Sequence, residues 1–224
     1  MASFRFIETF PALDAVEGLV HAFILKHPEI DVVTDRETAL KRLEEHHHTQ
    51  LAALGIDHNH LATGDQVHGK IVFCCDPLGG AVNAHHHQTD GLATATVGQF
   101  IGVFVADCGA VYIADPIKRA CALVHSGKKG SELGIAAEAI SLMKRHYGSN
   151  PADLVVQIAP CIRPPMYEID FAAQIIRSCE KEGVPTDQIH DCGTCTTSDP
   201  DLYYSYRLEK GKTGRLFAVI GWNS

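Results

Sequence analysis

Three residues that can bind metals or take part in covalent chemistry stand where apolar runs of the sequence end. His68 and Cys108 each precede a glycine, and His125 precedes a Ser-Gly pair. Glycine at such positions lets backbone or a ligand approach closely. Two imidazoles and one thiolate suit zinc, and three protein ligands leave a fourth position for water or substrate, as in catalytic zinc sites. The residue types therefore indicate a zinc site with catalytic potential.

The same residues are compatible with other chemistry. Copper accepts this ligand set, although a blue-copper site usually adds a weak axial methionine, for which the three methionines offer no obvious candidate. Cys108 could instead be the nucleophile of a cysteine hydrolase, with His125 as its base. A third alternative is a catalytically altered protein that keeps the metal only for shape or partner binding. The second imidazole, at His68, favours a metal, because a nucleophile and its base do not need it.

The elements that must position these residues alternate between strands and helices. Strands are expected over 3–10, 18–25, 66–75, 100–116, 119–127 and 153–162, with a hairpin over 203–222. Helices are expected over 35–55, over 132–148 with Ser131 as the N-cap, and over 170–183 beginning at Asp170. This alternation predicts an α/β protein with a mixed sheet. No repeat or linker interrupts it, so a single domain over residues 1–224 is expected.

Composition excludes several classes of function. The formal net charge of −8 argues against binding nucleic acid or anionic lipid by bulk attraction. The N-terminus lacks the pattern of a signal peptide, and no run approaches the roughly 20 apolar residues that span a bilayer. We therefore expect a cytoplasmic protein that binds neither nucleic acid nor membranes. The eight cysteines are expected to remain free thiols rather than to form structural disulfides.

Longer stretches carry a family resemblance. They are DQVHGKIV, TDGLATATVGQFIGVFVADCGAVYIADP, CALVHSGKKG, IAPCIRPPMYEI and CTTSDPDLYYSYRLEKGKTGRLFAVIGW. In this order they resemble the bacterial laccase-domain family, once called polyphenol oxidases and now regarded as purine nucleoside phosphorylases. The resemblance covers nearly the whole chain. It implies a mixed β-sheet sandwich flanked by helices, similar to the cytotoxic necrotising factor fold, and zinc bound by His68, Cys108 and His125.

The resemblance also implies a reaction. Family members cleave adenosine, inosine, guanosine and methylthioadenosine with phosphate, and they deaminate adenosine. The expected partners are thus a purine nucleoside and phosphate, with zinc as cofactor and copper as the alternative, in a monomer or homodimer. Copper-dependent phenol oxidation is the least favoured activity, because a multicopper oxidase needs more histidine ligands than one His-Cys-His set.

Individual residues receive expected roles in that reaction. Cys108 and His125 form the expected catalytic centre, where Asp107 would orient groups or transfer a proton. Gln66 is expected to hydrogen-bond at the mouth of the site. Arg42 and Tyr167 match family positions and are expected to bind substrate.

The chain departs from the family pattern after His125. Where the family has Ala-Gly-Trp-Arg-Gly, this sequence reads Ser-Gly-Lys-Lys-Gly, so that Lys128 replaces an aromatic residue and Lys129 an arginine. Lys129 keeps the charge that would attract phosphate but loses the bidentate fork of arginine. A Gly-, Ser- and Asn-rich loop that follows His-Gly-Phe in the family is also missing after His21 to Phe23. These departures predict an altered choice of substrate.

Other conspicuous motifs are interpreted as structural or adventitious. The histidine runs 46–48 and 85–87 cannot each direct three adjacent imidazoles at one ion, although His87 lies just before the family-like TDGL stretch. The Cys192–Cys195 pair, with C-x-x-C spacing, lacks the strand-to-helix context of a redox motif and is interpreted as packing. The KGKTG stretch at 210–214 lacks the upstream glycine of a P-loop and is interpreted as a turn.

Overall fold

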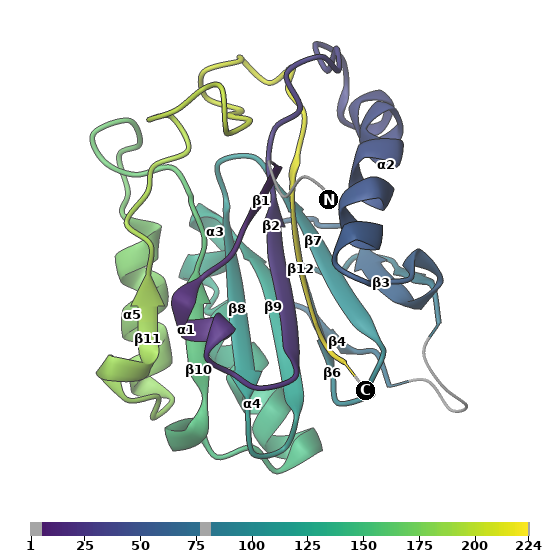
Figure 1. The fold of residues 1–224 in the computed structure, drawn as a ribbon. Helices are drawn as coiled ribbons and strands as arrows, with labels where there is room; N and C mark the ends of the chain where they lie inside the picture. The colour runs from purple at the N-terminus through teal and green to yellow at the C-terminus, as the bar shows by residue number, and fades with distance from the viewer. Residues whose placement is uncertain (1–5, 77–81, 224) are drawn as a thin grey trace.

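The computed structural model describes residues 6–76 and 82–223. Two six-stranded mixed sheets form its centre (Figure 1). The first has the order β1-β2-β12-β7-β3-β5 and the second β11-β10-β8-β9-β6-β4. The strands of the first sheet are β1 (Ile7–Glu8), β2 (Leu19–Ile24), β3 (Leu61–Gly64), β5 (Ala84–His86), β7 (Phe100–Val105) and β12 (Leu216–Trp222). Those of the second are β4 (Val72–Cys74), β6 (Gly91–Thr94), β8 (Gly109–Asp115), β9 (Ala120–Ser126), β10 (Val155–Ile158) and β11 (Ile189–Asp191).

Helices cover the outer faces of this sandwich. The longer helices are α2 (Arg36–Ala53), α4 (Ile135–Tyr147) and α5 (Phe171–Lys181), and the short ones are α1 (Pro11–Asp14), α3 (Lys128–Glu132), η2 (His58–His60), η3 (Pro151–Asp153) and η4 (Thr186–Gln188). In Figure 1, α2 lies beside the first sheet, whereas α4 and α5 lie on the side of the second. The layers are therefore helix, sheet, sheet and helices, which confirms the predicted fold class.

Three apolar clusters hold these layers together. The largest lies between the sheets, where Phe23 and Ile101 of the first sheet belong to the same buried cluster as Tyr112 and Leu123 of the second. A second cluster joins the second sheet to α4 and α5, and a third joins the first sheet to the end of α2. Burial of this apolar surface from both faces is the main force that fixes the two sheets relative to one another.

Several predicted elements differ from the structure, and of the strand predicted over 66–75 only β4 forms. Only β12 of the hairpin predicted over 203–222 is a strand, and it pairs with β2 and β7, while residues 203–215 form turns and extended segments. Ser131 is not the cap of the long helix, because it lies inside α3 and bonds to the Ser126 hydroxyl. Gly134, in the left-handed conformation at φ 74°, is the N-cap of α4 instead. The left-handed glycine lets the chain turn sharply from α3 into α4.

Other predicted features agree with the structure. Helix α2 begins after Asp35, whose carboxylate accepts a hydrogen bond from the Thr38 amide, and α5 begins after Asp170 in the same way. The eight cysteines are free thiols. Residues 3–5 of the first predicted strand lie outside the described residues. None of the described helices combines the length and apolarity needed to cross a bilayer.

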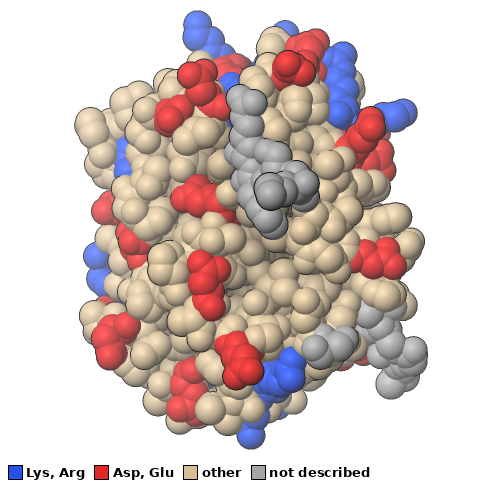
Figure 2. Space-filling model, viewed as in Figure 1, with Lys and Arg blue, Asp and Glu red and all other residues tan. Residues whose placement is uncertain are grey.

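The negative net charge is visible at the surface. Figure 2 shows acidic side chains scattered over the face seen in Figure 1, with lysines and arginines mostly towards its margins. On this face, the described residues therefore do not form the concentrated positive patch that binds the phosphates of nucleic acid.

Candidate active site

Strand pairing brings the cysteine and one histidine together. Strands β8 and β9 are antiparallel, with Gly109 opposite Ser126 and Ala110 opposite His125. Cys108 stands one residue before β8. This register therefore places it beside the end of β9, which carries His125. The thiol and imidazole at the ends of these apolar strands therefore face one site.

The third residue comes from the segment that connects the first sheet to the second, between β3 and β4. His68 lies on the segment that follows β3, in the left-handed conformation at φ 60°. Its ring meets that of His125 edge to face, with centroids 4.8 Å apart. The ligand atoms of His68, Cys108 and His125 all lie within 4.8 Å of one another. The structure thus brings together three residues that are distant in sequence.

A buried aspartate that the sequence analysis did not select holds both histidines. Asp90 is fully buried, and its carboxylate accepts hydrogen bonds from the backbone amides of Val67, His68 and Gly69 at 3.1, 2.8 and 2.7 Å. It also lies 3.0 Å from Nδ1 of His125. Fixing one imidazole nitrogen in this way leaves Nε2 to face the site and sets the tautomer, as the outer partners of metal-binding histidines do. The TDGL stretch contained this residue, but only the contacts reveal its role.

Charge coupling in the site shifts three pKa values. Burial alone would raise the pKa of Cys108, but hydrogen bonds from His125 and His68 lower it to about 6. Burial alone would lower the pKa of His125, but Asp90 and Cys108 raise it to about 9. Burial likewise opposes ionisation of Asp90, and the hydrogen bond from His125 and those from the backbone outweigh it, so that its pKa is lowered. Without a metal the site therefore favours a thiolate beside an imidazolium.

The backbone around these three residues also leaves room for a metal ion. A Cβ atom at Gly127 would lie 2.5 Å from the Cys108 sulfur, so this position requires glycine for the thiolate to face the site. One thiolate and two imidazoles are the donor types that zinc prefers, and they leave a position open. His68, Cys108 and His125 are therefore suited to hold the metal.

A cavity of about 480 Å³ opens above this centre. It lies within the size range of small-molecule sites. Its apolar and aromatic lining includes Phe104, Ile162, Tyr167, Phe171 and Tyr206, and its cations are Arg36, Lys128, Arg207 and Arg215. Tyr167 thus lies in the cavity, as the sequence predicted, with the Arg207 guanidinium over its ring. The cavity offers aromatic surface to a flat ring and positive charge to an anion.

Asp107 and Gln66 also line the cavity, but their polar groups are occupied. The Asp107 carboxylate accepts hydrogen bonds from the Thr196 hydroxyl and the Arg207 amide, both at 2.7 Å. The Gln66 amide bonds to the carbonyl and the N–H of Phe104, which extends the pairing between the segment after β3 and β7. Both contacts favour positioning: Asp107 holds the segment that carries Arg207, and Gln66 holds the segment that carries His68.

Two of the residues predicted to bind substrate or phosphate lie elsewhere. Arg42 binds the Asp31 carboxylate at 2.7 Å and does not line this cavity. Lys129 is exposed on α3 and does not line it either, whereas its neighbour Lys128 does. Arg36, one helical turn and a half before Arg42 on α2, is the lining arginine of that helix. The pattern of buried residues on α2 could have indicated which side of the helix carries Arg36. The position of the cavity could not be read from the sequence.

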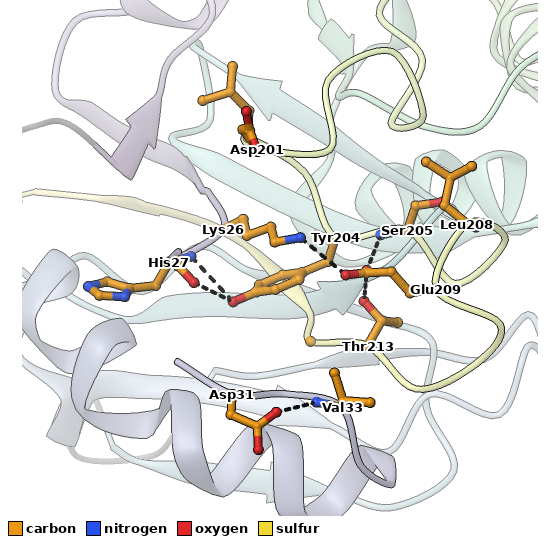
Figure 3. Close-up of polar contacts among 12 residues, drawn as sticks. Lys26, His27, Asp31, Val33, Asp201, Tyr204, Ser205, Leu208, Glu209 and Thr213 are labelled. Carbon is orange, nitrogen blue, oxygen red and sulfur yellow. Dashed lines mark hydrogen bonds and ion pairs between the residues drawn. The ribbon is translucent and has the colours of Figure 1, made fainter. Parts of the chain in front are cut away.

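The segment between residues 203 and 215 delivers further cations although it has no regular secondary structure. Figure 3 shows how polar contacts hold it. Glu209 accepts hydrogen bonds from the Ser205 amide at 3.0 Å and from the Thr213 hydroxyl, and it pairs with Lys26 at 3.1 Å. The Tyr204 hydroxyl lies between the backbone N–H and C=O of His27. These ties to the end of β2 fix the ends of a loop that carries Tyr206 and Arg207.

The other histidine runs and the C-x-x-C pair have different environments. His46 and His47 are buried on the inner face of α2. His47 lies near Phe104 and Phe217, and burial lowers its pKa to about 3. Cys192 and Cys195 are free and do not line the cavity. The stretch 210–214 begins as a turn, with Lys210 and Gly211 at positive φ.

Comparison with known proteins agrees with this site. The family model described as multi-copper polyphenol oxidoreductase laccase matches residues 30–177 and 167–223. The chain is 30% identical over 162 residues to the purine nucleoside phosphorylase YlmD of Bacillus subtilis, a match that covers 59% of this chain and 58% of that protein. It is 30% identical over 196 residues to a purine nucleoside phosphorylase of Mycobacterium bovis, covering 76% of this chain and 75% of that protein.

The fold agrees as well. The structure of the hypothetical protein YfiH of Bacillus licheniformis superposes with a TM-score of 0.82 at 24% identity, covering 94% of this chain and 95% of that one. Together, a family model that spans most of the sequence, a shared fold and a convergent His-Cys-His group show that the chain belongs to the multi-copper polyphenol oxidoreductase laccase family, a family of metal-binding proteins.

Proposed function

We propose that this protein is a zinc-dependent purine nucleoside phosphorylase. The observation that carries the proposal is the meeting of the His68, Cys108 and His125 ligand atoms at a cavity that also holds four cationic side chains. The names of the relatives from Bacillus subtilis and Mycobacterium bovis support the same reaction class.

The cavity divides into groups suited to the two substrates. The guanidinium groups of Arg36, Arg207 and Arg215 can bind phosphate oxygens with paired N–H donors, and Lys128 adds a point charge. The purine would pack against Tyr167 and Phe171, whose rings lie 6.1 Å apart. Holding both substrates in one pocket replaces a bimolecular encounter by a positioned one, which is the main contribution such a site makes to rate.

Phosphorolysis forms a bond from a phosphate oxygen to C1′ of the ribose and breaks the bond from C1′ to N9 of the purine. The departing base must gain a proton, and the phenols of Tyr167 and Tyr206 are hydroxyl donors on the cavity wall. Zinc held by the three ligands would supply a Lewis acid that polarises an oxygen of phosphate or substrate. The chain's own cations orient the phosphate and stabilise its charge.

The decisive assay measures free base released from inosine, adenosine, guanosine and methylthioadenosine, with and without phosphate. We expect release that depends on phosphate and that falls by at least about a hundredfold in His68→Ala and Cys108→Ala. Cys192→Ser is the matched control, since this free cysteine lies outside the cavity, and it should keep full activity. Phosphate-independent conversion of adenosine to inosine, with release of ammonia, would instead identify the deaminase activity. No turnover by zinc-loaded protein would contradict the proposal.

A second function is favoured by one specific observation: the Cys108 thiol lies beside the His125 imidazole, whose Nδ1 is 3.0 Å from the Asp90 carboxylate. A thiolate and imidazolium of this kind are the reactive pair of cysteine hydrolases. Alkylation of Cys108 separates the two functions. If the metal is resident, bound zinc should block alkylation and a chelator should restore it, whereas rapid alkylation of zinc-loaded protein would favour the nucleophile.

A further inference from the structure

A second group of potential metal ligands lies on the surface, on β5 and the segment after β3. Parallel pairing of these strands sets Thr63 opposite His85 and Gly64 opposite His86. Alternate residues of a strand point to the same side, so His85 and His87 flank one position. Asp65 lies beside this stretch, because its amide bonds to the His86 carbonyl at 3.0 Å.

The three side chains already touch. The Asp65 carboxylate lies 2.8 Å from Nε2 of His85 and 2.7 Å from Nδ1 of His87. The histidine rings are edge to face, with centroids 5.6 Å apart, and one ligand atom from each of the three residues lies within 4.8 Å of the others. Donor atoms that share one zinc at about 2.0–2.2 Å are about 3.0–3.5 Å apart, so small side-chain rotations would suffice.

A further contact orients one of these ligands. The Thr63 hydroxyl lies 3.0 Å from Nδ1 of His85, on the opposite side of the ring from Asp65. Without an ion, His85 donates its Nε2 proton to Asp65. With an ion bound, the Thr63 hydroxyl can accept the Nδ1 proton, which leaves the Nε2 lone pair for the ion. Outer hydrogen bonds of this kind orient metal-binding histidines. Thr63 is thus a positioning residue for the group.

We propose that Asp65, His85 and His87 form a second binding site for a divalent transition-metal ion, separate from the His68, Cys108 and His125 centre. Two imidazoles and one carboxylate suit zinc and other first-row divalent ions. The side chains of Asp65, His85 and His87 are 44%, 49% and 81% exposed, so water can complete the coordination and the ion can exchange with solvent. This site binds more weakly than the thiolate-containing one.

The position of the site links it to the catalytic segments. Asp65 directly precedes the segment 66–69, and His87 lies three residues before Asp90, which accepts hydrogen bonds from that same segment. An ion at the second site therefore fastens two stretches of chain that are already joined at the first site. No part of this inference depends on the reaction that the protein catalyses.

Zinc binding is measured by equilibrium dialysis in a His68→Gln/Cys108→Ser background, which removes two of the three ligands of the first site. We expect this background to bind one zinc. Adding His85→Gln/His87→Gln should weaken that binding by more than about tenfold, and adding Thr63→Val by about tenfold. The matched control is His58→Gln/His60→Gln, which removes two histidines with the same spacing beside an aspartate, Asp57, and should leave binding unchanged.

Cobalt distinguishes the two sites spectroscopically in the full-length protein. The first equivalent should produce a thiolate-to-cobalt charge-transfer band from Cys108, and a second equivalent should bind without adding to that band. Far-UV circular dichroism checks that each variant is folded. The proposal is overturned if the background binds no zinc, or if the His58/His60 control loses as much binding as the His85/His87 variant.

Discussion

The two groups of histidine and aspartate differ in burial, and that difference decides their chemistry. Asp90 is fully buried and accepts four hydrogen bonds, one of them from His125. Asp65 makes similar contacts with His85 and His87 but is 44% exposed. Water screens the charge of Asp65, whereas the charge of Asp90 must be balanced entirely by hydrogen bonds and charges within the protein. The buried group is thus fixed and strongly coupled, and the exposed group is open to exchange.

Burial alone does not explain the buried site. His47 is also buried, but its nearest rings are apolar and no carboxylate contacts it, and its pKa is lowered to about 3. His125 has Asp90 and Cys108 beside it, and its pKa is raised to about 9. The comparison teaches that burial lowers the pKa of both imidazoles, and that hydrogen bonds to a carboxylate and a thiolate outweigh it at His125.

Asp90→Asn should produce the largest effect. The amide cannot accept all of the hydrogen bonds that the carboxylate accepts, so we expect the free energy of unfolding of metal-depleted protein to fall by about 3 kcal/mol. Asp65→Asn, the matched change in the exposed group, should alter it by less than about 0.5 kcal/mol. Urea denaturation followed by fluorescence of Trp222, the single tryptophan, measures both. Equal losses in the two variants would remove the distinction drawn from burial.

Acid should destabilise the protein through two buried histidines whose pKa values are lowered mainly by burial. The folded-state pKa values of His47, about 3, and His21, about 4, lie below the ordinary 6.5. Their stabilising contribution is complete above pH 6.5 and is lost as pH falls towards those values, because the unfolded chain binds the protons first. Each of these histidines should lower the free energy of unfolding by about 2 kcal/mol as the pH falls from 6.5 to 5.

The variant His47→Phe tests this assignment, because phenylalanine cannot be protonated and suits the neighbouring aromatic rings. Its loss of unfolding free energy between pH 7 and pH 5 should be about 2 kcal/mol smaller than that of the wild type. Urea midpoints at the two pH values provide the measurement. An unchanged pH dependence would show that His47 does not titrate as its surroundings indicate.

Gly127→Ala tests how closely the backbone cradles the buried site. The new methyl group would meet the Cys108 sulfur at 2.5 Å and displace it, so zinc affinity of the first site should fall by about tenfold. Gly130→Ala, three residues later, has its nearest contact at 3.4 Å and should change affinity by less than about twofold. Competition with a chromophoric chelator measures zinc binding at this site. A normal affinity in Gly127→Ala would contradict the need for glycine.

The smallest predicted effect separates two adjacent lysines. Lys128 lines the cavity and lies 4.0 Å from Glu168, while Lys129 points elsewhere from the same short helix. If the cavity binds phosphate, Lys128→Ala should raise the KM for phosphate by about threefold, consistent with the modest energy of an exposed charge. Lys129→Ala should leave it unchanged. A larger effect from Lys129 would restore the role that the sequence motif suggested.

Much of the local structure was predictable from local physics. The N-cap aspartates at 35 and 170 mark helix starts, because a carboxylate that accepts from the first amides needs no tertiary partner. The failed hairpin shows the limit of this reasoning. Residues 203–215 contain strand-like tyrosines, but Tyr204, Ser205 and Glu209 satisfy their polar groups with the end of β2 and with one another instead of with a partner strand.

The residues of the candidate site show the same division. Cys108 and His125 were identified by residue type and family motif, whereas Asp90 and Arg36 carried no distinctive local signal. Arg42 and Lys129 resembled anion-binding residues by sequence position, but the faces of α2 and α3 that line the cavity carry Arg36 and Lys128 instead. A rotation of one residue along a helix changes the direction of a side chain by about 100°, which no motif comparison resolves.

The sequence by itself determined the residue types that could bind a metal, the alternation of strands and helices and the family. Only the tertiary structure decided which of those residues meet, because metal-ligand distances are set by strand register and by a buried carboxylate that joins His125 to the segment that carries His68. It also separated a buried centre from an exposed one, since burial depends on what the rest of the chain packs against and not on the local sequence.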